Sequence, residues 1–236
     1  MGYLQRRRDV RASPYEETPG YPRTLASLAA PPPTVTPVER RSVVSARAPR
    51  FIVVDDHPLM RTAIVGRLAA AAPDSTIVYE GPSAMAAAAV ARTSGADCAI
   101  VDLDLGDGSS PADNVRLLVE LEVPVVAFSA TSRPDLVRET LAAGALAYVS
   151  KTAPEDQFTA AISSALLGQP FTSAEVAQVL LFDESSEVRL SDQERHALVL
   201  YASGMKMEAV ARKMGVSITT AHEYIKRVRA KYTKAG

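Results

Sequence analysis

Short runs of consecutive apolar residues alternate with Ala- and Leu-rich stretches through the middle of the chain, and this alternation limits the folds that it can adopt. The apolar runs lie at 51–54, 76–79, 98–101, 123–128 and 145–149. The stretches that follow them, at 58–72, 83–93, 112–121, 134–143 and 155–168, have helical composition. Strands that are apolar throughout, rather than at alternate residues, are typical of a parallel sheet covered by helices on both faces.

Five such repeats predict an α/β fold with a flavodoxin-like, doubly wound, five-stranded parallel sheet. The last part of the chain shows only helical patterns. Ser191 and Glu194 have the spacing of a capping box, Gly215 can end a second helix, and Ser217 can cap a third. We therefore predict a small all-α domain with helix-turn-helix geometry after the sheet domain.

The predicted organisation has four parts. Residues 1–49 are rich in Arg and Pro and poor in large apolar side chains, so we predict a disordered N-terminal extension. Residues 50–168 form the sheet domain, 169–189 form a linker with some helix around 173–181, and 190–236 form the helical domain.

The formal net charge of −1 is the sum of three unlike segments. Residues 1–50 hold nine Arg against four acidic residues, 51–189 hold eight basic against nineteen acidic residues, and 190–236 hold nine basic against four. Such asymmetry predicts separate tasks for the segments. Because the two folded domains carry opposite charge, we also expect that they attract each other and that added salt separates them.

Several classes of protein are excluded by simple features. The single cysteine, Cys98, cannot form an internal disulfide, which favours a reducing compartment. No run reaches the roughly 18 apolar residues of a membrane span, and no apolar segment of a secretory signal follows Arg6–Arg8. We therefore expect a cytoplasmic protein that has no membrane partner.

Polar residues gather where the predicted strands end. Asp55 and Asp56 follow the first strand, Asp102 the third, Ser129 the fourth and Lys151 the fifth. The carboxyl ends of parallel strands meet at one edge of a sheet, so these side chains should lie together. Converging carboxylates need a cation, and hard oxygen ligands suit Mg²⁺ completed by a phosphate. This pattern predicts phosphoryl transfer, with an Asp carboxylate as a possible nucleophile.

Residues 51–168 resemble the receiver domain of bacterial two-component response regulators. The stretches that carry the resemblance are Asp55-Asp56-His57-Pro58-Leu59, Asp102 to Gly108, Phe128-Ser129-Ala130 and Gly144 to Lys151. The resemblance implies that Asp102 is the phosphoacceptor and that Asp55, Asp56, Asp102 and the backbone carbonyl of Asp104 hold Mg²⁺. It also implies that Ser129 and Lys151 contact the phosphoryl group and that Tyr148 is the aromatic switch residue. The family commonly has Pro where this chain has Gly106, so we expect a more mobile loop there.

Basic residues follow the predicted helical corner. His222, Lys226 and Arg229 recur at helical spacing, opposite an apolar stripe, and Lys231 and Lys234 add positive charge. Residues 190–232 resemble the LuxR-type DNA-binding domain of the NarL/FixJ subgroup, on Leu190-Ser191, Glu194, Ser203-Gly204, Glu208 to Ala211, Ser217, Thr220, Ile225 and Lys231. The predicted DNA-binding residues are Ser217, Thr219, Thr220, His222, Glu223, Lys226, Arg227 and Arg229.

We therefore expect a transcriptional regulator, not an enzyme, that a sensor histidine kinase phosphorylates on Asp102. It would then bind double-stranded operator DNA as a homodimer. One alternative keeps the fold but binds DNA independently of phosphorylation. Another reads Asp102-Leu103-Asp104 as the nucleophile motif of an Asp-dependent phosphohydrolase, although such enzymes place it after the first strand.

Overall fold

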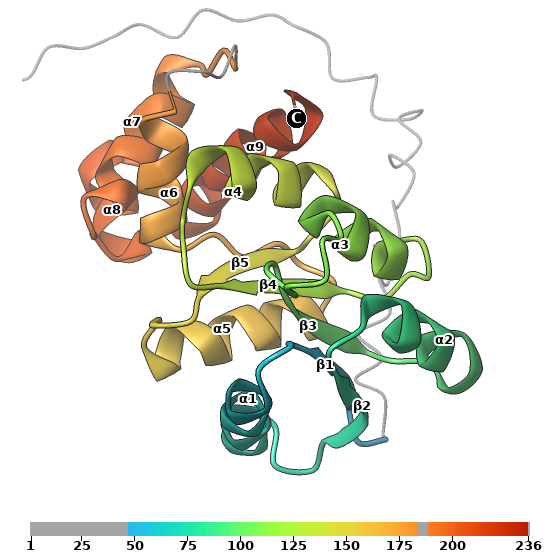
Figure 1. Ribbon diagram of the computed structural model, residues 1–236. Helices are drawn as coiled ribbons and strands as arrows, with labels where there is room; N and C mark the ends of the chain where they lie inside the picture. Colours follow the sequence, from blue (N-terminus) through green and yellow to red (C-terminus); the bar gives the residue numbers. More distant parts are fainter. Residues whose placement is uncertain (1–46, 184–187, 236) are drawn as a thin grey trace, which may run out of the picture. The chain divides into compact units, whose positions relative to one another are not determined.

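The computed structural model describes residues 47–183 and 188–235 (Figure 1). Nearly all of the predicted N-terminal extension therefore lies outside the described residues, which belong to one compact unit, Val43–Gly236. The strands are β1 (Arg50–Val54), β2 (Thr76–Gly81), β3 (Cys98–Asp102), β4 (Val125–Ser129) and β5 (Ala147–Ser150). They pair in parallel in the order β2-β1-β3-β4-β5, which confirms the predicted doubly wound sheet.

Five helices cover the two faces of this sheet (Figure 1). Their bounds are α1 (Pro58–Ala71), α2 (Ala84–Ser94), α3 (Pro111–Val119), α4 (Pro134–Ala142) and α5 (Glu155–Leu166). Alternate strand residues point to opposite faces. Phe51 and Val53 pack with α1 and α5, whereas Ile52 and Val54 pack in the core that includes residues of α2, α3 and α4. This two-sided burial explains why the strands are apolar throughout.

Four helices follow the sheet. They are α6 (Ala174–Leu181), α7 (Asp192–Ala202), α8 (Met207–Met214) and α9 (Ile218–Ala235). The capping box of Ser191 and Glu194 begins α7, as predicted. Gly215 has φ 68°, which glycine adopts most readily, and this residue makes the corner between α8 and α9.

The predicted linker 169–189 contains α6, which packs against both α4 and α7. Gln178 Nε2 on α6 donates to the carbonyl of Ala202 at 2.7 Å, and the Tyr201 hydroxyl donates to the carbonyl of Thr172 at 2.9 Å. One apolar core continues from Val137 and Leu141 of α4 to the helices α6–α9. None of the described helices is long and apolar enough to cross a membrane.

Candidate functional site

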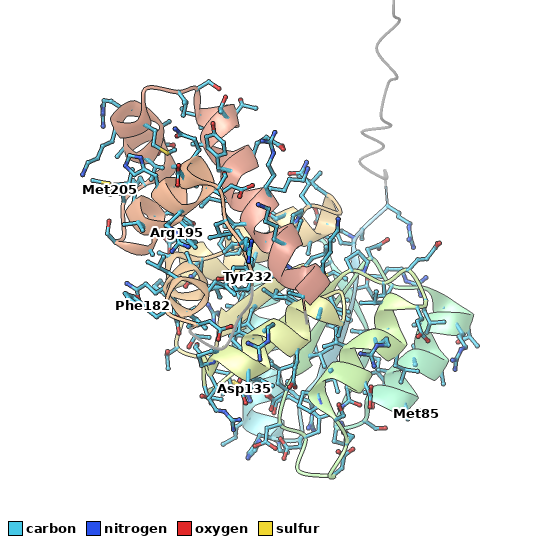
Figure 2. All side chains as sticks on the ribbon, turned by 90° about the horizontal axis from the view of Figure 1, so that it is seen from above. Met85, Asp135, Phe182, Arg195, Met205 and Tyr232 are labelled. Carbon is cyan, nitrogen blue, oxygen red and sulfur yellow. The ribbon has the colours of Figure 1, made fainter. Side chains whose placement is uncertain are left out.

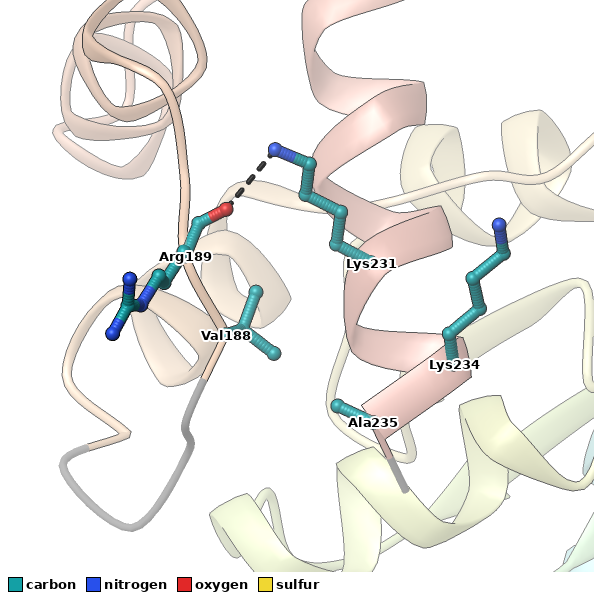
Figure 3. Close-up of a pocket in the computed structure, with 5 residues that line it drawn as sticks. All are labelled: Val188, Arg189, Lys231, Lys234 and Ala235. Atoms are coloured by element: carbon teal, nitrogen blue, oxygen red, sulfur yellow. Dashed lines mark hydrogen bonds between the residues drawn. The ribbon is translucent and has the colours of Figure 1, made fainter.

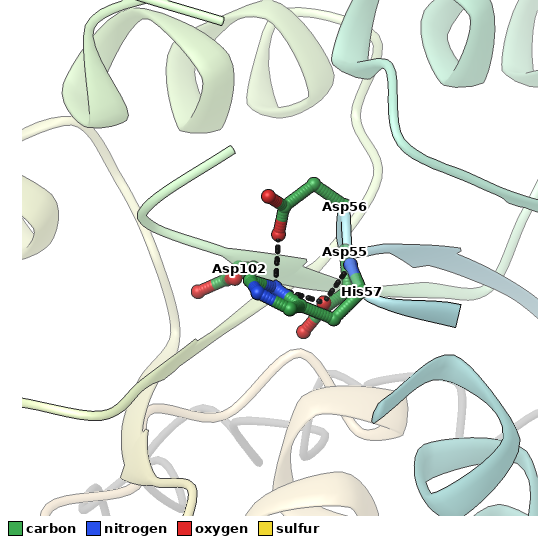
Figure 4. Close-up of side chains that lie close together, drawn as sticks. All are labelled: Asp55, Asp56, His57 and Asp102. Atoms are coloured by element: carbon green, nitrogen blue, oxygen red, sulfur yellow. Dashed lines mark hydrogen bonds and ion pairs between the residues drawn. The ribbon is translucent and has the colours of Figure 1, made fainter. Parts of the chain in front are cut away.

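Two strands bring the predicted acidic residues to one edge of the sheet. Asp55 directly follows β1 and is fully buried, and Asp102 ends β3 and is 2 % exposed. Ligand atoms of Asp55, Asp56, His57 and Asp102 all lie within 4.8 Å of one another (Figure 4). The predicted cluster therefore forms, and His57 joins it.

Lys151, directly after β5, supplies positive charge to this cluster. Its Nζ lies 2.8 Å from Asp55 Oδ2 and 2.7 Å from Asp102 Oδ2. Burial raises the pKa of the Asp102 carboxyl, and the contact with Lys151 offsets this in part. Burial alone lowers the pKa of Lys151, but its bonds to Asp102 and Asp55 outweigh that effect and raise it. Lys151 is accordingly a charged ammonium shared by two carboxylates.

Asp56 carries a buried oxygen that lacks a hydrogen bond. Its Oδ1 has no hydrogen-bond partner among the described residues, although His57 Nδ1 lies 2.5 Å away at ion-pair distance. The backbone N–H of His57 donates to Asp55 Oδ1 at 2.8 Å, which fixes the chain just before α1. Carboxylate oxygens of Asp55 and Asp56 that lie this close to Asp102 fit a site for a hard cation.

The loop after β3 passes close to Asp56. Asp104 N donates to Asp102 Oδ1 at 3.3 Å, while the Asp104 side chain is exposed. Gly106 has φ 65°, and a Cβ at this position would lie 3.2 Å from Asp56 Oδ2. Proline is fixed near φ −65°, so this backbone path requires a residue other than the family's usual proline.

Ser129 and Tyr148 lie on the neighbouring strands. Asp102 of β3 pairs with Phe128 of β4, so Ser129 is the next residue along that edge. Ser129 is buried, and its Oγ accepts from the backbone N–H of Thr131 at 3.3 Å. Tyr148 is also buried, and its hydroxyl donates to the carbonyl of Thr131. Both side chains thus bind the start of the loop that joins β4 to α4.

The first turns of α9 present most of the predicted DNA-binding residues to solvent. Thr219, His222, Glu223, Lys226 and Arg227 are exposed. Ser217 is exposed and precedes the helix, where its Oγ accepts from the backbone N–H of Thr220 at 3.0 Å. These residues form the open face of a helix that follows a sharp corner, the arrangement by which helix-turn-helix proteins enter the major groove.

Two basic residues of α9 are engaged elsewhere. Arg229 is buried, so the structure does not bring it to the exposed face. Lys231 Nζ lies 2.6 Å from Glu194 Oε2 and donates to the carbonyl of Arg189 at 3.0 Å. Lys231 also lines a pocket of about 300 Å³ at the end of α9, together with Val188, Arg189, Lys234 and Ala235 (Figure 3).

Comparisons with known proteins agree with this geometry. Residues 51–163 match the response regulator receiver domain, and 188–231 match sigma-70 region 4. The chain is 26 % identical over 186 residues to the nitrate/nitrite response regulator NarL of Escherichia coli, covering 75 % of this chain and 85 % of NarL. The chain belongs to the response regulators.

Solved structures of response regulators share this fold. A LuxR-family response regulator from Aurantimonas is 26 % identical, with a TM-score of 0.51, over 56 % of this chain and 94 % of that one. The RcsB response regulator of Salmonella typhimurium is 22 % identical, with a TM-score of 0.52, over 79 % and 92 %. The receiver domain and helix-turn-helix region make this response regulator a phosphorylation-dependent, DNA-binding regulator of transcription, a family that is not typically enzymatic.

Two features of this response regulator were missed by sequence reasoning. The motif Asp55-Asp56-His57 does not by itself indicate that the His57 side chain lies against Asp56. Arg229 was placed with His222 and Lys226, although it also lies four residues after Ile225 and three before Tyr232, both buried. The spacing from Ile225 and Tyr232 places Arg229 on the apolar stripe of α9, and this spacing could have indicated that Arg229 is buried.

Proposed function

We propose that Asp102 accepts a phosphoryl group from a sensor histidine kinase and that the phosphorylated protein binds operator DNA through α9. The observation that carries this proposal is the Asp102 carboxylate. It lies at the carboxyl end of β3, is buried, and is held 2.7 Å from Lys151 Nζ beside Asp55 and Asp56.

The proposed step is an exchange of one bond to phosphorus for another. An oxygen of Asp102 bonds to phosphorus while the bond between phosphorus and the kinase histidine breaks. The imidazole nitrogen keeps that electron pair and takes a proton, and Asp102 becomes an acyl phosphate. Lys151 Nζ lies 2.7 Å from an oxygen of Asp102, so its ammonium can pair with the oxygens of a phosphoryl group on that carboxylate.

The acidic cluster also fits Mg²⁺, which the receiver family implies. Asp55, Asp56 and Asp102 would hold the ion, with the Asp104 carbonyl as a further ligand by resemblance. The grouping of ligand atoms from Asp55, Asp56 and Asp102 within 4.8 Å of one another supports this assignment, because converging carboxylates need a cation. When bound, Mg²⁺ neutralises negative charge on the transferring phosphoryl group.

Ser129 and Tyr148 are the proposed switch. Both bind Thr131, the second residue after β4, so a movement of the Ser129 hydroxyl toward a phosphoryl group would pull on the loop that leads into α4. Since α4 packs against α6 and α9, this loop connects the region of Asp102 to the helices that follow the sheet.

The exposed face of α9 is the proposed DNA reader. Lys226 and Arg227 would contact phosphates, while His222 and Glu223 would face base edges, with Ser217, Thr219 and Thr220 at the helix start. RcsB, whose fold this chain shares, has been solved in a complex with DNA. We further propose that the active form is a cytoplasmic homodimer.

Intact mass after incubation with acetyl phosphate and Mg²⁺ tests the acceptor. The wild-type protein should gain one phosphoryl group, and Asp102→Asn should gain none. Asp113→Asn, which changes an exposed carboxylate on α3, is the matched control and should behave like wild type. An undiminished adduct on Asp102→Asn would refute the assignment, and its absence from the wild type would favour a regulator that does not use phosphorylation.

A further inference from the structure

A buried cation joins α9 to the sheet domain without a carboxylate partner. Arg229 is 6 % exposed, and no ion pair with a carboxylate of the described residues involves it. Desolvation lowers the pKa of its guanidinium to about 10, so the group remains charged at neutral pH. A buried charge of this kind is costly unless its donors are satisfied, so its partners identify what the residue does.

Those partners are two backbone carbonyls, one in the sheet domain and one in the linker that packs against it. Arg229 Nη1 donates to the carbonyl of Phe171 at 2.8 Å, and Nη2 donates to the carbonyl of Ala145. Ala145 lies between α4 and β5, and the Phe171 side chain packs against the core beneath α1 and α5. Each end of the guanidinium fork therefore has its own acceptor.

The two carbonyls are held beside each other by a separate bond. The backbone N–H of Phe171 donates to the carbonyl of Leu146, the residue after Ala145, at 2.8 Å. Leu146 N in turn donates to the carbonyl of Val125 at the start of β4. These two bonds connect the pair of segments to the sheet and hold the two carbonyls beside each other.

The opposite side of α9 remains open in the same conformation. Lys226, Arg227 and Ala230 are exposed, whereas Val228, Arg229 and Tyr232 are buried. The hydroxyl of Tyr232 bonds the carbonyl of Leu180 at 2.5 Å, which attaches α9 to α6 rather than to the sheet (Figure 2). Arg229 therefore makes polar contacts between the buried side of α9 and backbone carbonyls outside the helical domain.

We propose that the carbonyls of Ala145 and Phe171 form a socket for a guanidinium group, and that Arg229 occupies this socket to dock α9 on the receiver domain instead of contacting DNA. The inference deepens the proposed function and rests on it for the DNA-binding role of the rest of α9. An arginine fits the socket because its planar fork donates to two acceptors at once, whereas a lysine ammonium is a single point of charge. The two carbonyls therefore suit a group with two N–H donors in one plane, as a guanidinium has.

Two readouts on the full-length, unphosphorylated protein test the socket. The first is hydrogen exchange at the amide of Phe171. Arg229→Ala should speed this exchange several-fold, because without the guanidinium the segments of Ala145 and Phe171 open to water more often. The second is the salt dependence of binding to a random-sequence duplex, which counts phosphate contacts. Arg227→Ala should reduce the slope of log K against log salt by about 0.9, whereas Arg229→Ala should leave it unchanged.

Arg229→Lys is the second variant and keeps the charge if the alanine variant does not fold. It should also speed exchange at Phe171 while leaving the salt slope unchanged. Unchanged exchange in both variants, or a loss of slope in Arg229→Ala equal to that in Arg227→Ala, would overturn the socket. The exchange readout needs no DNA, so a wild-type protein that fails to bind the duplex would count against the proposed function and not against the socket.

Discussion

Lys151 shows how one side chain can set the charge of a buried site. It bridges Asp55 and Asp102, and both carboxylates are almost completely buried. Removing the ammonium would leave these carboxylates unpaired, and Lys151→Ala should destabilise the metal-free protein by about 2 kcal/mol. Added Mg²⁺ should stabilise this variant more than the wild type, because the ion replaces the missing positive charge. Urea unfolding with and without Mg²⁺ measures both effects.

The matched control is Lys213→Ala, which removes an exposed lysine of α8. Its unfolding free energy and its response to Mg²⁺ should equal those of the wild type. An equal Mg²⁺ response in Lys151→Ala and the wild type would show that the ion does not enter this cluster.

Two glycines with different surroundings give opposite expectations for the same substitution. Gly144 has φ 102°, and a Cβ there would lie 2.9 Å from Val119 Cγ1. Gly66 lies inside α1, and a Cβ there would meet nothing within 4 Å. Gly144→Ala should therefore destabilise the protein by more than about 1 kcal/mol, whereas Gly66→Ala should stabilise it by roughly 0.5–1 kcal/mol. Thermal unfolding of the two variants compares them directly, and a stabilised Gly144→Ala would contradict the strain assigned to that loop.

At the scale of elements, local chemistry determined most of the fold. The five strands and the five helices that follow them were predicted to within a few residues, because burial on both faces makes each strand apolar and caps or prolines begin each helix. Two starts were less accurate. The apolar run at β5 begins at Ala145, but the strand begins at Ala147. The apolar run at β4 begins at Val123, but the strand begins at Val125. Pro124 cannot donate a hydrogen bond to a neighbouring strand, which explains this limit.

The start of α7 combines a cap with an ion pair. The side chain of Glu194 accepts from the Ser191 backbone N–H at 2.8 Å and lies 2.6 Å from Lys231 Nζ. The bond from Lys231, aided by Ser191, holds the pKa of the Glu194 carboxyl below its ordinary value of 4.5. Because that pKa is lower in the folded state, the carboxylate stabilises the fold above its ordinary pKa, and this stability is lost as pH falls through the folded value.

Glu194→Gln should therefore lower the free energy of unfolding by about 1–2 kcal/mol at neutral pH. The difference from the wild type should shrink as the pH falls below the ordinary pKa of the carboxyl. Denaturant unfolding across this pH range measures the trend. Glu208→Gln, at an exposed position in the first turn of α8, is the control and should show little difference at any pH. A deficit that stays constant with pH would assign the effect to packing.

At the scale of the whole molecule, charge counts indicated attraction but not the contact that the structure contains. The sequence carried no signal for how the helical unit meets the sheet domain, because a docking surface depends on which side chains become neighbours after folding. The contact uses the apolar core from Val137 and Leu141, the Arg229 bonds to carbonyls, and the pair of Arg138 with Asp183 at 2.7 Å. The acidic partner in that pair is itself 2 % exposed.

A contact built from these groups should not separate in salt, whereas the charge counts predicted that added salt would separate the two domains. Salt screens exposed charges, with a Debye length that falls from about 10 Å at 0.1 M to about 3 Å at 1 M, but it affects buried pairs, carbonyl bonds and apolar contacts much less. The radius of gyration of the unphosphorylated wild type, measured by X-ray scattering, should therefore stay constant over this range. Arg229→Ala should have a larger radius at both salt concentrations, since its loss removes a buried contact. Expansion of the wild type at 1 M salt would instead show that long-range attraction between the acidic and basic segments holds the two parts together.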